Sequence, residues 1–98
     1  MRERIKIRLP KLADIPFAES WAGMIDVMPD VVPVMDQAPE LKGFFIAAGF
    51  SGHGFGIGPG AGRVMADLVQ GKPPGHDLQR FRLSRFSDGS KIELGPTL

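Results

Sequence analysis

The feature that most limits how this chain can fold is the glycine-rich segment GFSGHGFGIGPGAG at residues 49–62, where glycine stands at nearly every second position. The apolar run FFIAA precedes this segment, and RVMADLVQG follows it. These stretches predict a buried strand, a glycine loop and a helix, with Pro59 in the first helical turn and Gly71 just past the helix end. Glycine lets a ligand approach the backbone, and the helix N-terminus presents N–H groups to that ligand.

Other stretches predict further strands before the loop. The alternation of apolar and basic residues in RERIKIRL, residues 2–9, indicates a half-buried strand, although the stretch is short enough to be a helix end. Residues 17–28 indicate a long strand bent near Gly23, and residues 31–35 indicate a returning strand. FFIAAGF, residues 44–50, has the continuous apolar pattern of a fully buried strand.

After the helix, the sequence predicts small elements. Asp77 suits the N-cap of a short helix over residues 78–83, and SDGS at residues 87–90 could join 82–86 to 91–94 as a hairpin. We expect the tail, residues 95–98, to be frayed. The core is expected to contain Trp21, Phe44, Phe45, Val64, Met65 and Leu68.

Length and composition favour one small domain, and the predicted strands, glycine loop and helix give it the class α+β. A chain of 98 residues with 43% apolar and 23% charged residues can form a single core. The chain has no cysteine, no signal-peptide pattern and no apolar run long enough to span a membrane, so we expect a cytoplasmic protein. Net charge is +4 over residues 1–11, −5 over 12–62 and +2 over 63–98, which argues against a nucleic-acid-binding face.

Formal motifs do not identify the ligand of the glycine segment. The P-loop and the strict dinucleotide fingerprint are absent, and only GIGPGA at residues 56–61 fits the looser fingerprint that ends in alanine. The sequence after the helix supplies no second buried strand for a βαβ unit. A purely structural glycine turn therefore stays open, but His53 is flanked by glycines and could reach a ligand. His53 and His76 lack zinc-site spacing, so no metal site is predicted.

Three stretches together resemble the C-terminal part of FAD-dependent oxidoreductases of the D-amino acid oxidase superfamily, which includes glycine and sarcosine oxidases and D-amino acid dehydrogenases. They are WAGMIDVMPDVVPVMD at residues 21–36, GFFIAAGFSGHGFGIGPGAGRVMADLVQG at 43–71 and FRLSRF at 81–86. The resemblance implies the C-terminal fragment of a two-domain flavoenzyme, with an FAD/NAD(P)-binding domain and a substrate domain. Residues 1–48 would supply substrate-domain strands, 49–71 the flavin-contacting loop and helix, and 72–98 a C-terminal helix or hairpin and tail.

The resemblance also implies roles for individual residues. His53 would face the substrate as a contact or an electrostatic tuner rather than an obligatory base, and Met24 and Ile25 would lie on the substrate side. The reaction would be oxidation of the C–N bond of an amino acid or amine by hydride transfer to flavin. The residues expected to contact FAD are Phe50, Ser51, Gly52, His53, Gly54, Phe55 and Gly56.

The sequence departs from the family pattern at three points. Glycine oxidases place a carboxylate-binding arginine near the position of Ile25, sarcosine oxidases carry a lysine that aligns with Gly56, and some relatives attach flavin through a cysteine. None of these residues is present here, so the resemblance implies noncovalent FAD and leaves the substrate open. We expect tight FAD binding to need the missing N-terminal part or another subunit.

Two alternatives remain at this stage. The chain could be a noncatalytic interaction module that self-associates through exposed apolar surface. It could also be a weak phosphate or nucleotide binder that acts through the glycine loop alone.

Overall fold

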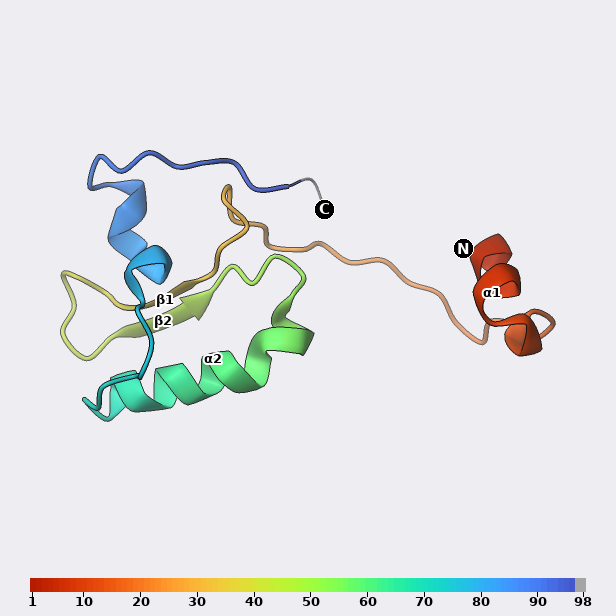
Figure 1. Ribbon diagram of the computed structural model, residues 1–98, viewed down its shortest axis with the longest axis horizontal. Coiled ribbons are helices and arrows are strands. Elements are labelled where there is room, and N and C mark those ends of the chain that lie inside the picture. Colours follow the sequence, from red (N-terminus) through yellow and green to blue (C-terminus); the bar gives the residue numbers. More distant parts are fainter. Residues whose placement is uncertain (97–98) are drawn as a thin grey trace.

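A computed structural model describes residues 1–96 as a small mixed α+β structure, which confirms the expected class (Figure 1). Two helices and two strands are joined by loops and three single 3₁₀ turns. In chain order, the elements are α1 (Arg2–Arg8), a 3₁₀ turn (Pro10–Leu12), β1 (Val34–Gln37), β2 (Phe45–Ala48), α2 (Gly54–Val69) and two further 3₁₀ turns (Gln79–Phe81 and Leu83–Phe86).

The core lies where α2 packs against a two-stranded sheet. Strands β1 and β2 pair antiparallel, with Val34 opposite Ala48 and Gln37 opposite Phe45. The segment that carries the last two 3₁₀ turns contacts β1. The buried apolar residues are Val34, Met35, Ala61 and Val64. β2 falls inside the predicted strand at residues 44–50, whereas β1 begins three residues later than the predicted strand at 31–35 and extends two residues beyond it. β2 is not fully buried, because its last two residues are exposed.

The N-terminal stretch is a helix, so the predicted strand at residues 2–9 is wrong. α1 lies apart from the rest of the structure at the end of an extended segment (Figure 1). A strand needs a neighbouring strand for its backbone hydrogen bonds, and no such neighbour lies beside this stretch in the described chain. A helix satisfies its own backbone, and a Lys6–Glu3 pair at 3.5 Å spans one turn.

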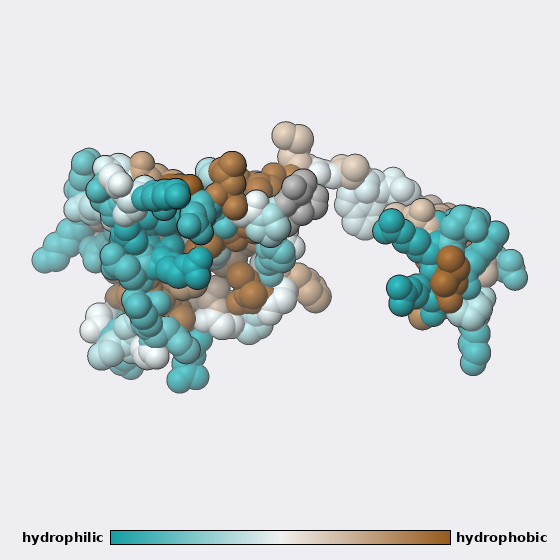
Figure 2. Space-filling view, turned by 45° about the horizontal axis from the view of Figure 1, so that its top comes forward, coloured by the Kyte–Doolittle hydropathy of each residue, from teal (hydrophilic) through white to brown (hydrophobic). Residues whose placement is uncertain are grey.

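Residues 17–28 form no strand either, so this second strand prediction is also wrong. The segment is extended but pairs with no strand among residues 1–96. Trp21, expected in the core, is 84% exposed, and Phe44 is exposed as well. The Cα radius of gyration is 18.4 Å, against about 13 Å for a compact chain of this length. Figure 2 shows hydrophobic side chains on the surface of the body, by which we mean residues 28–96.

α2 begins earlier than predicted and ends where predicted. Its first residue is Gly54, so Pro59 lies inside the helix rather than at its start. Its last residue is Val69, and Gly71 follows with φ of +70°, the left-handed conformation that favours glycine after a helix. Of the helix residues expected in the core, Val64 is buried, whereas Met65 and Leu68 are half-buried.

The C-terminal third replaces the predicted short helix and hairpin with two 3₁₀ turns and an irregular stretch. Asp77 does cap locally, because its Oδ1 accepts a hydrogen bond from the Gln79 amide at 3.0 Å. No strand forms over residues 82–94, where the Arg82 guanidinium instead binds Asp88 and Ser90. The Gly95 amide donates to the Pro29 carbonyl at 3.0 Å, so the predicted fraying is wrong there, and residues 97–98 lie outside the described part.

Candidate functional site

The inner side of the glycine loop faces the protein and is packed. Gly49 has φ of +71°, and the Met28 side chain occupies the space that a Cβ there would need. Ser51 is only 2% exposed. Its hydroxyl accepts a hydrogen bond from the Met28 amide at 3.1 Å and donates one to the Gly49 carbonyl at 3.2 Å, while its own amide donates to the Asp26 carbonyl at 3.2 Å. This side leaves no space for a ligand.

The outer side of the same loop is open. The N–H groups of Gly52, Gly54 and Phe55 have no acceptor among the described residues. A Cβ placed on Gly56 would have no atom within 4 Å, and the Phe55 side chain is fully exposed. These N–H groups stand at the start of α2, where the helix dipole favours negative charge. The outer side can therefore accept an electron-rich flat molecule.

His53 lies at the junction of the two sides. Its amide donates to the Phe50 carbonyl at 2.9 Å, and its carbonyl accepts from the amides of Gly56 and Ile57 at 3.1 Å, so its backbone forms the turn that starts α2. The imidazole is exposed and makes no hydrogen bond with the described residues. The Phe50 side chain lies under the loop, with its Cβ 3.5 Å from the position of a Cβ on Gly54.

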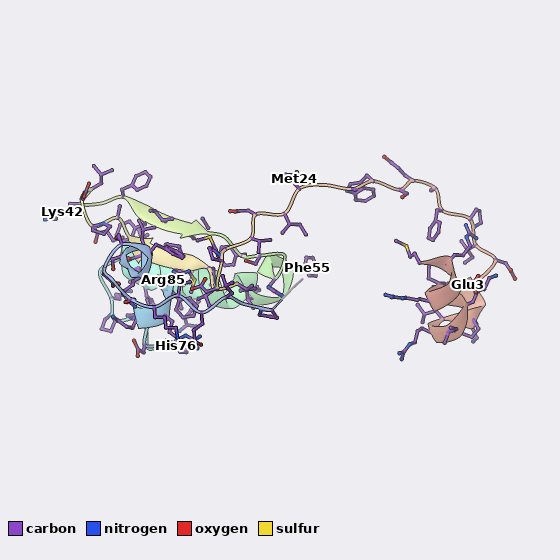
Figure 3. All side chains as sticks on the ribbon, turned by 90° about the horizontal axis from the view of Figure 1, so that it is seen from above. Glu3, Met24, Lys42, Phe55, His76 and Arg85 are labelled. Atoms are coloured by element: carbon purple, nitrogen blue, oxygen red, sulfur yellow. The ribbon has the colours of Figure 1, made fainter. Side chains whose placement is uncertain are left out.

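The structure brings one of the two expected substrate-side residues to the loop. The Ile25 Cδ1 atom lies 3.7 Å from the position that a Cβ on Gly52 would occupy. Met24 is fully exposed, and Figure 3 places it on the extended segment where that segment reaches the body, while Phe55 projects from the body. Ile25 and Gly52 are thus neighbours, whereas Met24 points into solvent.

An ion pair that the sequence did not reveal fixes the turn before β1. The buried Arg85 guanidinium binds both carboxylate oxygens of Asp30, at 2.8 and 3.1 Å, and the Val32 carbonyl at 2.6 Å. It also lies 4.2 Å from the Phe86 ring centroid. Burial works to raise the pKa of Asp30, but the hydrogen bonds from Arg85 and Val32 and the positive charge of Arg85 outweigh it and lower that pKa.

The residues expected to contact flavin thus divide into two sets. The amides of Gly52, Gly54 and Phe55 have no acceptor among the described residues, and Gly56 has open space at its Cβ position, which fits a flat ring with electron-rich edges. Ser51 does not fit this role, because its hydroxyl and amide are both used inside the protein. No group of three or more metal-ligating side chains lies within residues 1–96, and no helix in that range is long and apolar enough to cross a membrane.

Comparison with known proteins matches the chain to one family and to several oxidases. The family described as FAD dependent oxidoreductase matches residues 1–68. Peroxisomal sarcosine oxidase of Homo sapiens is 39% identical over 90 residues, which cover 92% of this chain and 23% of that protein. Peroxisomal sarcosine oxidase of Mus musculus is 44% identical over 66 residues, covering 67% of this chain and 17% of that protein.

A third relative, N-methyl-L-tryptophan oxidase of Salmonella typhimurium, is 44% identical over 62 residues, which cover 63% of this chain and 17% of that protein. The comparison with solved structures finds no match. The chain therefore spans between 17% and 23% of the length of these relatives. Because the family match extends over residues 1–68, the chain belongs to the FAD-dependent oxidoreductase family.

Proposed function

We propose that this chain is the flavin-contacting portion of an FAD-dependent oxidoreductase that oxidises the C–N bond of an amino acid or amine. The observation that carries the proposal is the outer side of the glycine loop, with three N–H groups that lack acceptors in the described chain and an open surface at Gly56. Family membership supports FAD as the ligand. In this proposal the loop and helix at residues 49–71 contact the flavin through the outer side of the loop, and residues 1–48 belong to the substrate side.

The chain contributes electrostatics and shape to this chemistry. When bound, FAD supplies a hydride acceptor for the carbon beside the substrate nitrogen. The amides of Gly52, Gly54 and Phe55 stabilise negative charge near the start of α2. Charge effects at a helix terminus are worth about 0.3–2 kcal/mol each, so this loop tunes the bound group but does not hold it alone.

The substrate side of the proposal consists of His53, Met24 and Ile25. His53 is exposed beside the open side of the loop, and Ile25 packs over Gly52. The relatives' names include sarcosine and N-methyl-L-tryptophan, so we propose an N-methylated amino acid or a similar small amine as substrate. Residues 24–27 contain no cation, so a substrate carboxylate would take its partner from elsewhere.

Tight flavin binding needs a partner in this proposal. The relatives are four to six times longer than the stretch that matches them, and the chain leaves Trp21, Phe44 and other large apolar residues exposed. The remainder of the family fold, as an N-terminal FAD-binding part or another subunit, would cover this surface. The chain has no cysteine, so we propose noncovalent FAD at this segment.

A titration of the isotope-labelled chain with riboflavin tests the proposal. We expect amide shifts centred on Gly52, Gly54 and Phe55, with a dissociation constant weaker than micromolar. Gly56→Leu should abolish these shifts because it fills the open surface, whereas Ala66→Leu, at an exposed position ten residues further along α2, should leave them in place.

Three outcomes of the titration count against the proposal. If millimolar riboflavin produces no shifts, the outer side is not a flavin surface. Equal shifts with ATP, which has no flavin ring, would favour the phosphate-binding alternative. Micromolar or tighter riboflavin binding by the chain alone would contradict the dependence on the rest of the fold.

The exposed apolar surface also supports a second candidate function, that of a noncatalytic interaction module. Trp21, Ile25 and Phe44 are all exposed, as a noncatalytic interaction module would require. Such a module would self-associate, because its apolar surface would find no other cover. Light scattering distinguishes the two functions: a monomer at high concentration would remove the interaction module.

A further inference from the structure

We infer that Ser51 is a positioning residue: its hydroxyl and amide hold residues 24–28 against the glycine loop, so that Ile25 and Gly52 keep a fixed spacing. Its importance for the reaction rests on the proposed function, in which Ile25 lies on the substrate side and Gly52 on the flavin side. The contacts themselves depend only on the structure.

Ser51 occupies a backbone conformation that normally belongs to glycine. Its φ is +53°, and it stands between Gly49 at +71° and Gly52 at +80°. A non-glycine residue rarely adopts this region and persists there when the surroundings compensate for the strain. The compensation that serine offers and glycine lacks is the hydroxyl, which bonds both the Met28 amide and the Gly49 carbonyl.

Ser51 is also the polar connection between the extended segment and the body. Among the described residues, the carbonyl of Asp26 accepts the only hydrogen bond that joins residues 16–27 to the rest of the chain, and its donor is the Ser51 amide. The Ser51 hydroxyl holds the next point along the segment, the Met28 amide. Residues 16–27 are all exposed, so packing adds little to hold that part of the segment.

The consequence falls on Ile25, which lies one residue before Asp26. Its Cδ1 atom packs over Gly52, 3.7 Å from where a Cβ would be. On each side, this contact lies one residue from the bond between the Ser51 amide and the Asp26 carbonyl, so loosening of the Ser51 attachment should separate Ile25 from Gly52. The remaining body would stay intact, because the sheet and the Asp30–Arg85 pair do not involve Ser51.

The test uses the labelled 98-residue chain with Ser51→Ala, Ser51→Gly and, as a matched control, Ser20→Ala, which removes an exposed hydroxyl from the same segment. Hydrogen exchange at the Met28 amide should become about five- to tenfold faster in both Ser51 variants, as the loss of one hydrogen bond implies. The nuclear Overhauser effect between the Ile25 methyl and the Gly52 Hα should weaken in both variants, which lose the hydroxyl bonds but keep the backbone bond from residue 51 to Asp26. Ser20→Ala should change neither quantity.

Ser51→Gly is the decisive variant, because it relieves the backbone strain while it removes the hydroxyl. If this variant keeps the wild-type exchange rate at Met28 and the Ile25–Gly52 contact, the hydroxyl does not position the segment and the inference is overturned. An unprotected Met28 amide in the unsubstituted chain would overturn it too.

Riboflavin separates this inference from the proposed function. In the unsubstituted chain the Ile25 methyl should shift together with the Gly52 amide, whereas in Ser51→Gly only the Gly52 amide should shift. If riboflavin moves no amide, the proposed function fails while the exchange result still decides the contact. If the Ile25 methyl shifts in Ser51→Gly as in the unsubstituted chain, the positioning role fails while the flavin surface stands.

Discussion

The inner and outer sides of the glycine loop differ in what explains their glycines. On the inner side, Gly49 is required by the chain itself, because φ is +71° and the Met28 side chain fills the neighbouring space. On the outer side, Gly56 lies within α2, where glycine weakens a helix, and nothing within 4 Å requires the absence of a side chain. The fold explains the inner glycine, whereas nothing in the described chain requires the outer one, and we propose that it leaves room for a ligand.

The same contrast applies to the backbone N–H groups. On the inner side the Ser51 amide binds Asp26, whereas on the outer side the amides of Gly52, Gly54 and Phe55 have no acceptor within residues 1–96. One short segment therefore combines a structural attachment with amides that are free to bind the ligand we propose.

The largest effect should come from Arg85→Met, which removes the ion pair that fixes the turn before β1. Breaking a buried ion pair costs about 3–5 kcal/mol. In this variant Asp30 would lose its partner, so the turn that holds Asp30 two residues after Met28 would lose its attachment. Urea unfolding should show this loss of free energy. Arg80→Met, at an exposed position with no described ion pair, is the control. A loss of unfolding free energy below about 1 kcal/mol for Arg85→Met would mean that the pair does not hold the turn before β1.

Gly49→Ala should destabilise the chain by about 2–4 kcal/mol, since the left-handed conformation and the contact with Met28 both oppose a Cβ. Gly43→Ala separates the two costs, because Gly43 has φ of +84° but no neighbour within 4 Å. Thermal or urea unfolding measures both variants. Equal losses for the two would show that the inner side is less tightly packed than described.

The same substitution on the outer side should have the opposite sign. Gly56→Ala should raise the free energy of unfolding of the isolated chain by up to about 1 kcal/mol, because alanine favours a helix more than glycine does. It should weaken riboflavin binding at the same time. A destabilised Gly56→Ala chain would contradict an open outer side.

The smallest effect concerns pH. The folded-state pKa of Asp30 lies below its ordinary value of 3.8, so its contribution to stability is present above that value and is lost as pH falls through the lower, folded pKa. The difference in unfolding free energy between the unsubstituted chain and Asp30→Asn should therefore stay constant near neutral pH and shrink below about pH 3.8. A difference that does not change with pH would show that the Asp30 charge is not what binds Arg85.

The sequence predicted the centre of the fold better than its two ends. The apolar run before the loop, the glycine segment and Gly71 predicted β2 and the end of α2, because these signals are local. Local pattern alone predicts strands at residues 2–9 and 17–28, but a strand exists only with a partner, and the described chain offers none to either stretch. Their apolar residues consequently stay exposed, Trp21 among them.

The sequence predicts which segment forms the site, but it does not predict which residues of that segment face the protein and which face outward. The list from Phe50 to Gly56 included Ser51, whose burial depends on contacts with Asp26 and Met28 that lie more than twenty positions earlier in the chain. The Asp30–Arg85 pair was hidden for the same reason, since 55 positions separate its partners. Long-range pairing of this kind leaves no periodic signal in a single sequence.

The most direct test of the flavin surface is a search for intermolecular nuclear Overhauser effects between riboflavin ring protons and the glycine Hα protons of the labelled chain. If the outer side of the loop receives the flavin, ring protons should contact Gly52, Gly54 and Gly56 but not Gly49, which is buried. Ring contacts confined to other parts of the chain, with none to these three glycines, would contradict the claim that the outer side of the loop receives a flavin.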